Sequence, residues 1–284
     1  MGRVSKPGGV PDPRELLELA VDLVRAGAEC VRSMREVAAS GVVTKSTPTD
    51  VVTAADRATE RLVIDRLREL RPGDDVLGEE TGTHPGLDRP GVVQAGVDRV
   101  RWLLDPIDGT VNFLYDIPYY SVSLAAEVAG RVVAGAVRNP VSGEEWTAVA
   151  GQGAYRDGRR LSGSSVSTLS QALLATGFGY DPARRAHQAR VVAELLDEVR
   201  DIRRLGAASL DLCMVAEGRV DAFYEKGLAP WDLAAGGLVA REAGLRVTGL
   251  DGDPAGTRMV LAAPAAIHQV LHDRLVALDA AGGP

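Results

Sequence analysis

The chain has 284 residues, of which 45% are hydrophobic and 25% charged; this composition is typical of a globular protein and excludes wholesale disorder. Its 39 acidic residues outnumber its 32 Lys and Arg residues, and the resulting net charge of −7 argues against a general binder of nucleic acid or of anionic membranes. The two cysteines, Cys30 and Cys213, are far apart and form neither a disulfide framework nor a zinc motif.

The N-terminal half begins with a polar segment and two expected helices. Residues 1–12 lack the apolar core of a signal peptide, and we expect them to be flexible. No apolar run in the chain is long enough to cross a membrane, so we expect a cytoplasmic protein. Apolar residues at helical spacing predict helices over 15–37 and 54–70.

Strands dominate the next part of the chain. Short strands are expected over 76–78 and 100–104, with a Gly- and Pro-rich surface loop over 83–96. Alternating and β-branched runs then predict an antiparallel meander, formed by 121–128, 132–137, 145–149 and 153–155.

Helices and strands alternate in the second half. The expected strands are 172–176, 201–204, 221–224, 246–248 and 259–262, and the expected helices are 184–199, 207–217, 231–243 and 265–278. This order predicts an α/β protein built from alternating layers of helices and mixed β-sheets. Because no linker interrupts it, we expect one domain over 13–280, with an N-terminal half of about 13–165 and a C-terminal half of about 166–280.

The most informative motif is Asp-Pro-Ile-Asp-Gly-Thr, residues 105–110, which follows the strand expected over 100–104. Asp105 and Asp108 can bind hard cations through oxygen. The N–H groups of Gly109 and Thr110, at a helix start, can face a phosphate. Asp-Pro and Asp-Gly are also common turn formers, so the motif alone is equally consistent with a simple turn.

Other polar residues are ambiguous when taken singly. Glu79 and Glu80 follow a short strand and could be solvated, while Asp56 and Asp232 near helix starts could be caps. The four histidines have no metal or triad context, and the pair on the last helix, His268 and His272, is expected to be solvated.

In combination, these stretches resemble the inositol monophosphatase family, the Mg-dependent, lithium-sensitive sugar and cyclitol phosphatases. Residues 102–113 (Trp-Leu-Leu-Asp-Pro-Ile-Asp-Gly-Thr-Val-Asn-Phe) are similar to its first signature, and 231–236 (Trp-Asp-Leu-Ala-Ala-Gly) to its second. The segments that also stand at the family's order and spacing are 45–46, 50–56, 78–80, 151–155 and 205–209. The resemblance covers about 16–278 and implies the sugar-phosphatase fold and a homodimer.

The resemblance implies a magnesium site with two or three ions. Glu79, Asp105 and the Ile107 carbonyl would bind one Mg²⁺, and Asp105, Asp108 and Asp232 a second. A third, weaker ion would use Glu79 and water. Carboxylates gathered in this way would repel one another unless divalent cations offset their charge. Li⁺ is the expected inhibitor.

The resemblance also implies the catalytic and substrate-binding residues. Thr110, hydrogen-bonded to Asp56, would help to orient and deprotonate the attacking water, with Glu79 as the third catalytic residue. The expected substrate contacts are Asp108, Gly109, Thr110, Gly206, Ala207, Ala208, Glu225 and Asp232. Glu225 suits a polyol because a carboxylate accepts hydrogen bonds from two hydroxyls. Arg203 and Arg204 remain open between substrate contact, subunit contact and solvated surface.

The implied reaction is hydrolysis of inositol monophosphate, a small phosphorylated polyol, by in-line attack of a metal-activated water. Histidinol phosphate, fructose 1,6-bisphosphate and a 3′-phosphoadenosine nucleotide remain alternative substrates, although residues 108–112 resemble the inositol-type branch more than the nucleotidases. A covalent aspartyl-phosphate mechanism is disfavoured because two residues, not one, separate the aspartates of the motif. A regulatory protein that has kept the fold is the remaining alternative.

Overall fold

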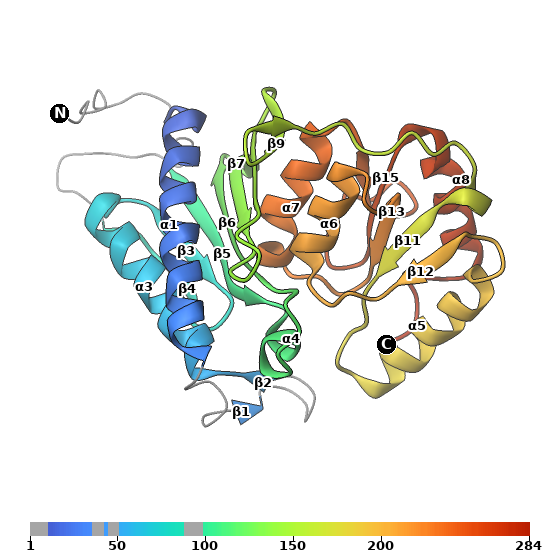
Figure 1. Ribbon diagram of the computed structural model, residues 1–284, viewed down its shortest axis with the longest axis horizontal. Helices are drawn as coiled ribbons and strands as arrows, with labels where there is room; N and C mark the ends of the chain where they lie inside the picture. The colour runs from blue at the N-terminus through green and yellow to red at the C-terminus, as the bar shows by residue number, and fades with distance from the viewer. Residues whose placement is uncertain (1–10, 36–42, 45–50, 88–98) are drawn as a thin grey trace.

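The computed structural model describes residues 11–35, 43–44, 51–87 and 99–284 as five layers of helix, sheet, helix, sheet and helix (Figure 1). This confirms the expected α/β layering. The helices are α1 (Pro13–Ser33), α3 (Ala54–Leu70), α4 (Thr110–Leu114), α5 (Pro182–Leu195), α6 (Ala208–Glu217), α7 (Pro230–Glu242) and α8 (Ala265–Ala277). Among the helices of the described ranges, none has both the length and the apolar character needed to cross a membrane.

The first sheet has eight strands in the order β10-β9-β8-β7-β6-β5-β3-β4. It is antiparallel throughout except for the parallel pair β3 and β5. Its strands are β3 (Asp75–Gly78), β4 (Gly82–His84), β5 (Val100–Asp108), β6 (Ser121–Val128), β7 (Arg131–Arg138), β8 (Glu145–Val149), β9 (Gly153–Arg156) and β10 (Arg159–Arg160). A separate two-stranded pair is formed by β1 (Val43–Thr44) and β2 (Val51–Val52).

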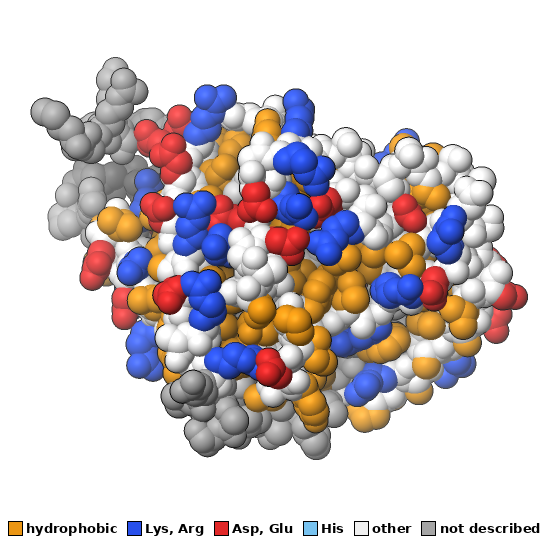
Figure 2. Space-filling model, in the orientation of Figure 1, with side chains coloured by type: hydrophobic (Ala, Val, Ile, Leu, Met, Phe, Trp, Pro, Cys, Tyr) orange, Lys and Arg blue, Asp and Glu red, His pale blue; other side chains and the backbone are white. Residues whose placement is uncertain are grey.

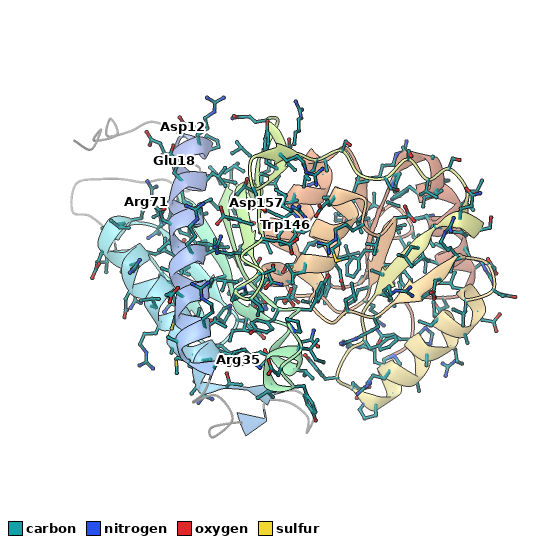
Figure 3. The ribbon with its side chains drawn as sticks, viewed as in Figure 1. Asp12, Glu18, Arg35, Arg71, Trp146 and Asp157 are labelled. Atoms are coloured by element: carbon teal, nitrogen blue, oxygen red, sulfur yellow. The ribbon has the colours of Figure 1, made fainter. Side chains whose placement is uncertain are left out.

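Helix α1 covers one face of this sheet and begins at a clear cap. The carboxylate of Asp12 accepts a hydrogen bond from the N–H of Arg14 at 2.9 Å, and Pro13 occupies the first turn, where its missing N–H costs nothing (Figure 3). The buried stripe of α1, which includes Leu16, Leu23 and Val31, packs against the sheet and against α3.

Helices α6 and α7 lie between the two sheets and join the two halves of the chain. Trp146 and Leu103 of the first sheet share one apolar cluster with Leu210 of α6 and Leu238 of α7. The second sheet has the order β12-β11-β13-β15-β14. Its strands are β11 (Leu173–Thr176), β12 (Asp201–Arg203), β13 (Ala222–Glu225), β14 (Arg246–Thr248) and β15 (Val260–Ala263), preceded by a 3₁₀ turn, η1 (Leu169–Gln171).

Side chains alternate between the two faces of the second sheet, as the pleat requires. Phe223 of β13 packs toward α6 and α7, whereas Tyr224 packs toward α5 and α8 on the outer face. The expected helices and strands of this half are all present, and their ends lie within about one helical turn of the predicted ones.

Three expectations are wrong. Strand β5 does not end at Leu104 but continues to Asp108, with an irregularity in its pairing to β6 between Asp105 and Asp108. Such an irregularity accommodates Pro106, which has no N–H to donate to the ladder.

The loop expected over 83–96 begins instead with β4, which pairs with β3. The expectations for residues 1–10 of the flexible N-terminal segment, for 45–46, for Asp50 and for residues 88–96 of the loop lie outside the described ranges.

The third wrong expectation concerns the last helix. His268 is buried rather than solvated, and its Nε2 lies 3.0 Å from Thr248 Oγ1. His272 Nε2 accepts a hydrogen bond from the N–H of Asp251 at 3.2 Å. These two side chains therefore attach α8 to the segment that contains β14.

Gly135 shows how closely α7 approaches the first sheet. A Cβ atom on Gly135 of β7 would lie 3.0 Å from the Cα and 3.2 Å from the Cβ of Ala235 in α7. We expect Gly135→Ala to lower the free energy of unfolding by about 1–3 kcal/mol, because neither backbone can move away without loss of packing. Urea unfolding checks this. Gly73→Ala is the matched control, since no atom lies within 4 Å of its added methyl group; equal effects of the two substitutions would contradict the close packing.

Candidate active site

The candidate active site forms where β3, β5 and α7 meet. Strands β3 and β5 are parallel neighbours, with Gly78 beside Leu104, so Glu79 and Asp105 follow at the same end of the two strands. Here the N–H of Glu79 donates to the carbonyl of Leu104 at 3.2 Å. Asp105 follows directly on β5, and Asp232 lies in the first turn of α7.

The carboxylates at this edge lie close enough to influence one another's charge. Asp105 interacts with both Glu79 and Asp232, and their negative charges disfavour its own. Burial and the charges of Glu79, Asp108 and Asp232 raise the pKa of Asp105 well above its ordinary value. Burial, together with Asp108 and Glu79, raises the pKa of Asp232 to about 8. These carboxylates form the carboxylate cluster: Glu79, Asp105, Asp108 and Asp232.

The chemistry of the carboxylate cluster fits Mg²⁺, a hard cation that prefers oxygen ligands. Within the described ranges, no three His, Cys, Asp or Glu side chains already surround one point as ligands. Divalent cations would offset the mutual repulsion of these carboxylates. The residues that could hold Mg²⁺ are the four carboxylates and the carbonyl of Ile107.

Asp108 has a second task besides its place in the cluster. Its carboxylate accepts hydrogen bonds from the N–H of Ala208 at 3.2 Å and from the N–H of Ser209 at 2.7 Å. The hydroxyl of Ser209 donates to the same carboxylate at 2.5 Å and lies 2.7 Å from the hydroxyl of Ser121. These bonds lower the pKa of Asp108 against the larger effect of burial, which raises it to about 6. Asp108 therefore ties the start of α6 to the end of β5.

Thr110 and Asp56 are in direct contact, although 54 positions separate them in the chain. The Thr110 hydroxyl lies 3.1 Å from Asp56 Oδ1 and 3.1 Å from the Ile107 carbonyl. The other carboxylate oxygen of Asp56 accepts the N–H of Thr53 at 2.8 Å in a capping box that begins α3. Burial raises the pKa of Asp56 to about 6. Asp56 is thus both a helix cap and the partner of Thr110.

Asp232 likewise caps a helix, because its Oδ2 accepts the N–H of Ala229 at 2.8 Å at the start of α7. The capping interpretation of Asp56 and Asp232 is therefore confirmed as a structural role. It does not compete with a role in the site, because Asp56 Oδ1 faces Thr110 and Asp232 also interacts with Asp105.

Glu60 is a site residue that the motifs did not reveal. It is fully buried in α3, where it accepts the N–H of Glu80 at 2.8 Å and the hydroxyl of Thr81. A Cβ on Gly78 would lie 2.6 Å from its carboxyl carbon, so only glycine leaves room there. Glu60 thereby holds the turn that carries Glu79. The signal in the sequence was a carboxylate on the apolar face of a helix, at the spacing of Val63 and Ile64.

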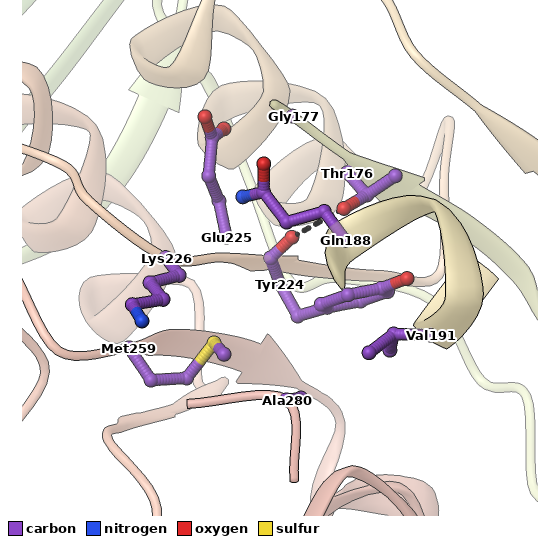
Figure 4. Close-up of a pocket in the computed structure, with 9 residues that line it drawn as sticks. All are labelled: Thr176, Gly177, Gln188, Val191, Tyr224, Glu225, Lys226, Met259 and Ala280. Carbon is purple, nitrogen blue, oxygen red and sulfur yellow. Dashed lines mark hydrogen bonds between the residues drawn. The ribbon is translucent and has the colours of Figure 1, made fainter. Parts of the chain in front are cut away.

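Glu225 ends β13 and lines a small cavity with Tyr224, Met259 and other residues of the second sheet and α5 (Figure 4). Its carboxylate points away from Val191 and Met259. Burial raises its pKa well above the ordinary value, with further contributions from Asp211, Asp232 and Asp108. Glu225 is therefore half-buried at the end of β13 rather than fully solvated.

Gly109 and Gly206 bring the two halves of the site together. Gly109 has φ +95°, and a Cβ there would lie 3.2 Å from the Gly206 carbonyl oxygen. The amide of Asn112 donates to the carbonyls of Tyr119 at 2.7 Å and Leu205 at 2.8 Å. The segment 205–208 is consequently held against α4, the helical turn that begins at Thr110.

Without metal, the raised carboxylate pKa values make stability depend on pH. Asp108 and Asp232 have folded-state pKa values of about 6 and 8, against an ordinary value of 3.8. The folded state binds more protons between these values, so the contribution of Asp108 and Asp232 to stability is full below about pH 4 and is lost as the pH rises toward 8. We expect the Tm of the metal-free protein to fall over this window and Mg²⁺ to raise it by about 5 °C at pH 8.

Thermal unfolding with EDTA and with Mg²⁺ checks this. Asp105→Asn should show a shallower pH dependence and a smaller gain from Mg²⁺, whereas Asp251→Asn, on an exposed loop, should behave as the parent protein. A Tm that rises with pH across this window, or that ignores Mg²⁺, would show that the cluster is not as described.

Comparisons with known proteins show which family the chain resembles over its length. A family model described as the inositol monophosphatase family matches residues 12–280. Inositol-1-monophosphatase SuhB of Mycobacterium tuberculosis is 46% identical over 277 residues, which cover 92% of this chain and 93% of the relative. Nus factor SuhB of Escherichia coli is 38% identical over 230 residues, covering 81% and 83%.

The solved structure of Mycobacterium tuberculosis SuhB has a TM-score of 0.79 at 41% identity and covers 95% of this chain and 99% of its own. The structure of SuhB from Bartonella henselae has a TM-score of 0.83 at 33% identity, covering 92% and 98%. With a family match over nearly the whole length and relatives of this similarity, the chain belongs to the inositol monophosphatase family.

Proposed function

We propose that the chain is a magnesium-dependent phosphomonoesterase that hydrolyses inositol monophosphate to inositol and phosphate. The observation that carries the proposal is the convergence of the carboxylate cluster with the Thr110–Asp56 pair at one sheet edge. Magnesium at the cluster would supply Lewis-acid activation of water and would neutralise the charge of the phosphate.

Thr110 and Asp56 would accept the proton that the attacking water loses. The Thr110 hydroxyl donates to Asp56, so its oxygen can accept a hydrogen bond from the water and relay a proton to the carboxylate. A pKa of about 6 suits Asp56 to accept that proton near neutral pH. The water oxygen bonds to phosphorus as the ester oxygen leaves with a proton, which gives the alcohol and inorganic phosphate.

The substrate would lie between the two halves of the chain. The N–H groups of Gly109 and Thr110 would face the phosphate, and the segment 206–208 with Glu225 would contact the alcohol portion. Glu225 can accept hydrogen bonds from two hydroxyls, which favours a polyol. The name of the relative from Mycobacterium tuberculosis, inositol-1-monophosphatase, supports inositol 1-phosphate. Inhibition by Li⁺ and assembly into a homodimer are further parts of this proposal, taken from the family.

A regulatory role is the second candidate, because the 38% identical relative from Escherichia coli is named a Nus factor. The retained carboxylate cluster favours catalysis, since binding a partner would not require Asp105 and Asp232 to remain beside each other. An assay of phosphate release separates the two candidate functions.

Phosphate release from inositol 1-phosphate should require Mg²⁺, be inhibited by Li⁺ and exceed release from fructose 1,6-bisphosphate and 3′-phosphoadenosine 5′-phosphate. Asp105→Asn should lower kcat at least about a hundredfold, because it removes a charge from the centre of the cluster. Asp251→Asn serves as the control. A folded, Mg²⁺-binding protein that releases phosphate from none of these esters would exclude the enzyme proposal for them and favour the regulatory one.

The proton relay is tested separately at Thr110. We expect Thr110→Val to lower kcat by roughly 10²–10³-fold with little change in KM, because the hydroxyl acts on the water rather than on the ester. Thr110→Ser, which keeps the hydroxyl, should recover most of the rate. Equal losses in both variants would contradict the relay, because Thr110→Ser retains the hydroxyl that the relay requires.

A further inference from the structure

Arg204 lies between β12 and α6, beside the segment proposed to contact the alcohol portion of the substrate. A Cβ on Gly206 would lie 2.5 Å from its Nη1, so the guanidinium rests against the backbone of that segment. The guanidinium carbon is 5.8 Å from the centre of the Phe178 ring, a cation–π distance that holds the side chain in place. Arg204 therefore presents a positive charge at the expected alcohol pocket.

The carboxylate of Glu225 lies next to the segment that carries the Phe178 ring. A Cβ on Gly177 would be 2.0 Å from Glu225 Oε2, and Gly177 directly precedes Phe178. The positive charge of Arg204 reaches both Glu225 and Asp211, whose pKa values it lowers against the larger effect of burial. A cation and an anion thus pack on adjacent residues, 177 and 178.

Arg203 and Arg204 differ in whether their donors are already used. Arg203 Nη1 lies 2.6 Å from Asp201 Oδ2 and 3.0 Å from the Ile202 carbonyl. Arg204, by contrast, forms no hydrogen bond or ion pair with any residue that the structure describes. The same is true of the carboxylate of Glu225 within those ranges. The donors of Arg204 and the acceptors of Glu225 are therefore both available to a ligand.

Hydroxyl and ammonium groups would experience this pair differently. A hydroxyl can donate to the carboxylate of Glu225 and accept from the guanidinium of Arg204. An ammonium can only donate, and the charge of Arg204 repels it at the distances across one pocket. We propose that Arg204 is a specificity residue that selects neutral polyol phosphates against phosphate esters of amino alcohols. This inference rests on the proposed function.

The test compares kcat/KM for inositol 1-phosphate and histidinol phosphate, whose amine is protonated at neutral pH. We expect Arg204→Gln to raise the ratio of histidinol phosphate to inositol phosphate turnover by about tenfold. Arg204→Lys, which keeps the charge, should stay near the parent ratio. Arg203→Gln is the matched control and should not change it, because that side chain is engaged with Asp201.

Each result has a separate meaning. A raised ratio in Arg204→Gln, retained selectivity in Arg204→Lys and an unchanged ratio in Arg203→Gln support the inference. Hydrolysis with the same ratio in Arg204→Gln and the parent protein, or equal shifts at Arg203 and Arg204, overturns it and leaves the proposed function standing. Release of phosphate from neither ester by the parent protein overturns the inference together with the proposed function for these substrates.

Discussion

The burial of several carboxylates at one sheet edge is the constraint on which the rest of the site depends. Asp105 is almost fully buried and lies beside three other acids, so its negative charge is disfavoured both by desolvation and by its neighbours. Such a cluster persists only because strand pairing, helix caps and hydrogen bonds fix each member independently. The fold therefore holds together carboxylates that would otherwise repel one another. The cluster consequently favours binding of a cation.

Those fixed positions come from elements that serve the fold at the same time. Asp56 and Asp232 begin α3 and α7, and Asp108 accepts the N–H groups that begin α6. Helix starts have unsatisfied N–H groups that favour a nearby carboxylate, so each acid is partly stabilised by its cap. Glu60 also accepts a backbone N–H, that of Glu80, and so fixes the turn after β3. Site and scaffold thus share hydrogen bonds, and loss of an acid would disturb both.

The sequence was most informative where local pattern decides structure. Apolar periodicity was sufficient for helix α3 and for the strands β6 and β14, which the structure reproduces with the same bounds. It was misleading at 105–108, where Asp, Pro and Gly indicate a turn but pairing with β6 resumes at Asp108 and extends β5. It was also misleading at His268, whose burial depends on α8 packing beside β14, a tertiary contact with no local signal.

The site shows the same division. The motif and its resemblance to a family named the acids, and the structure brings Thr110 beside Asp56 and Asp105 beside Asp232. The supporting partners Glu60, Ser121 and Ser209 were not predicted, because single polar residues within helices and strands have no distinctive spacing. Their roles follow only from distances between segments that are remote in the chain.

The groups for chemistry and the groups for recognition come from different halves of the chain. Most of the carboxylate cluster and Thr110 belong to the first sheet and its connections, whereas Glu225, Arg204 and the segment 205–208 belong to the second sheet and α6. Asp108 joins the two, since it belongs to the cluster and also holds Ala208. Substitutions at 177–178, 204 and 225 can consequently alter which alcohol portion of a substrate fits, and they need not move a carboxylate of the cluster. A family with one reaction and several substrates is what this separation would produce.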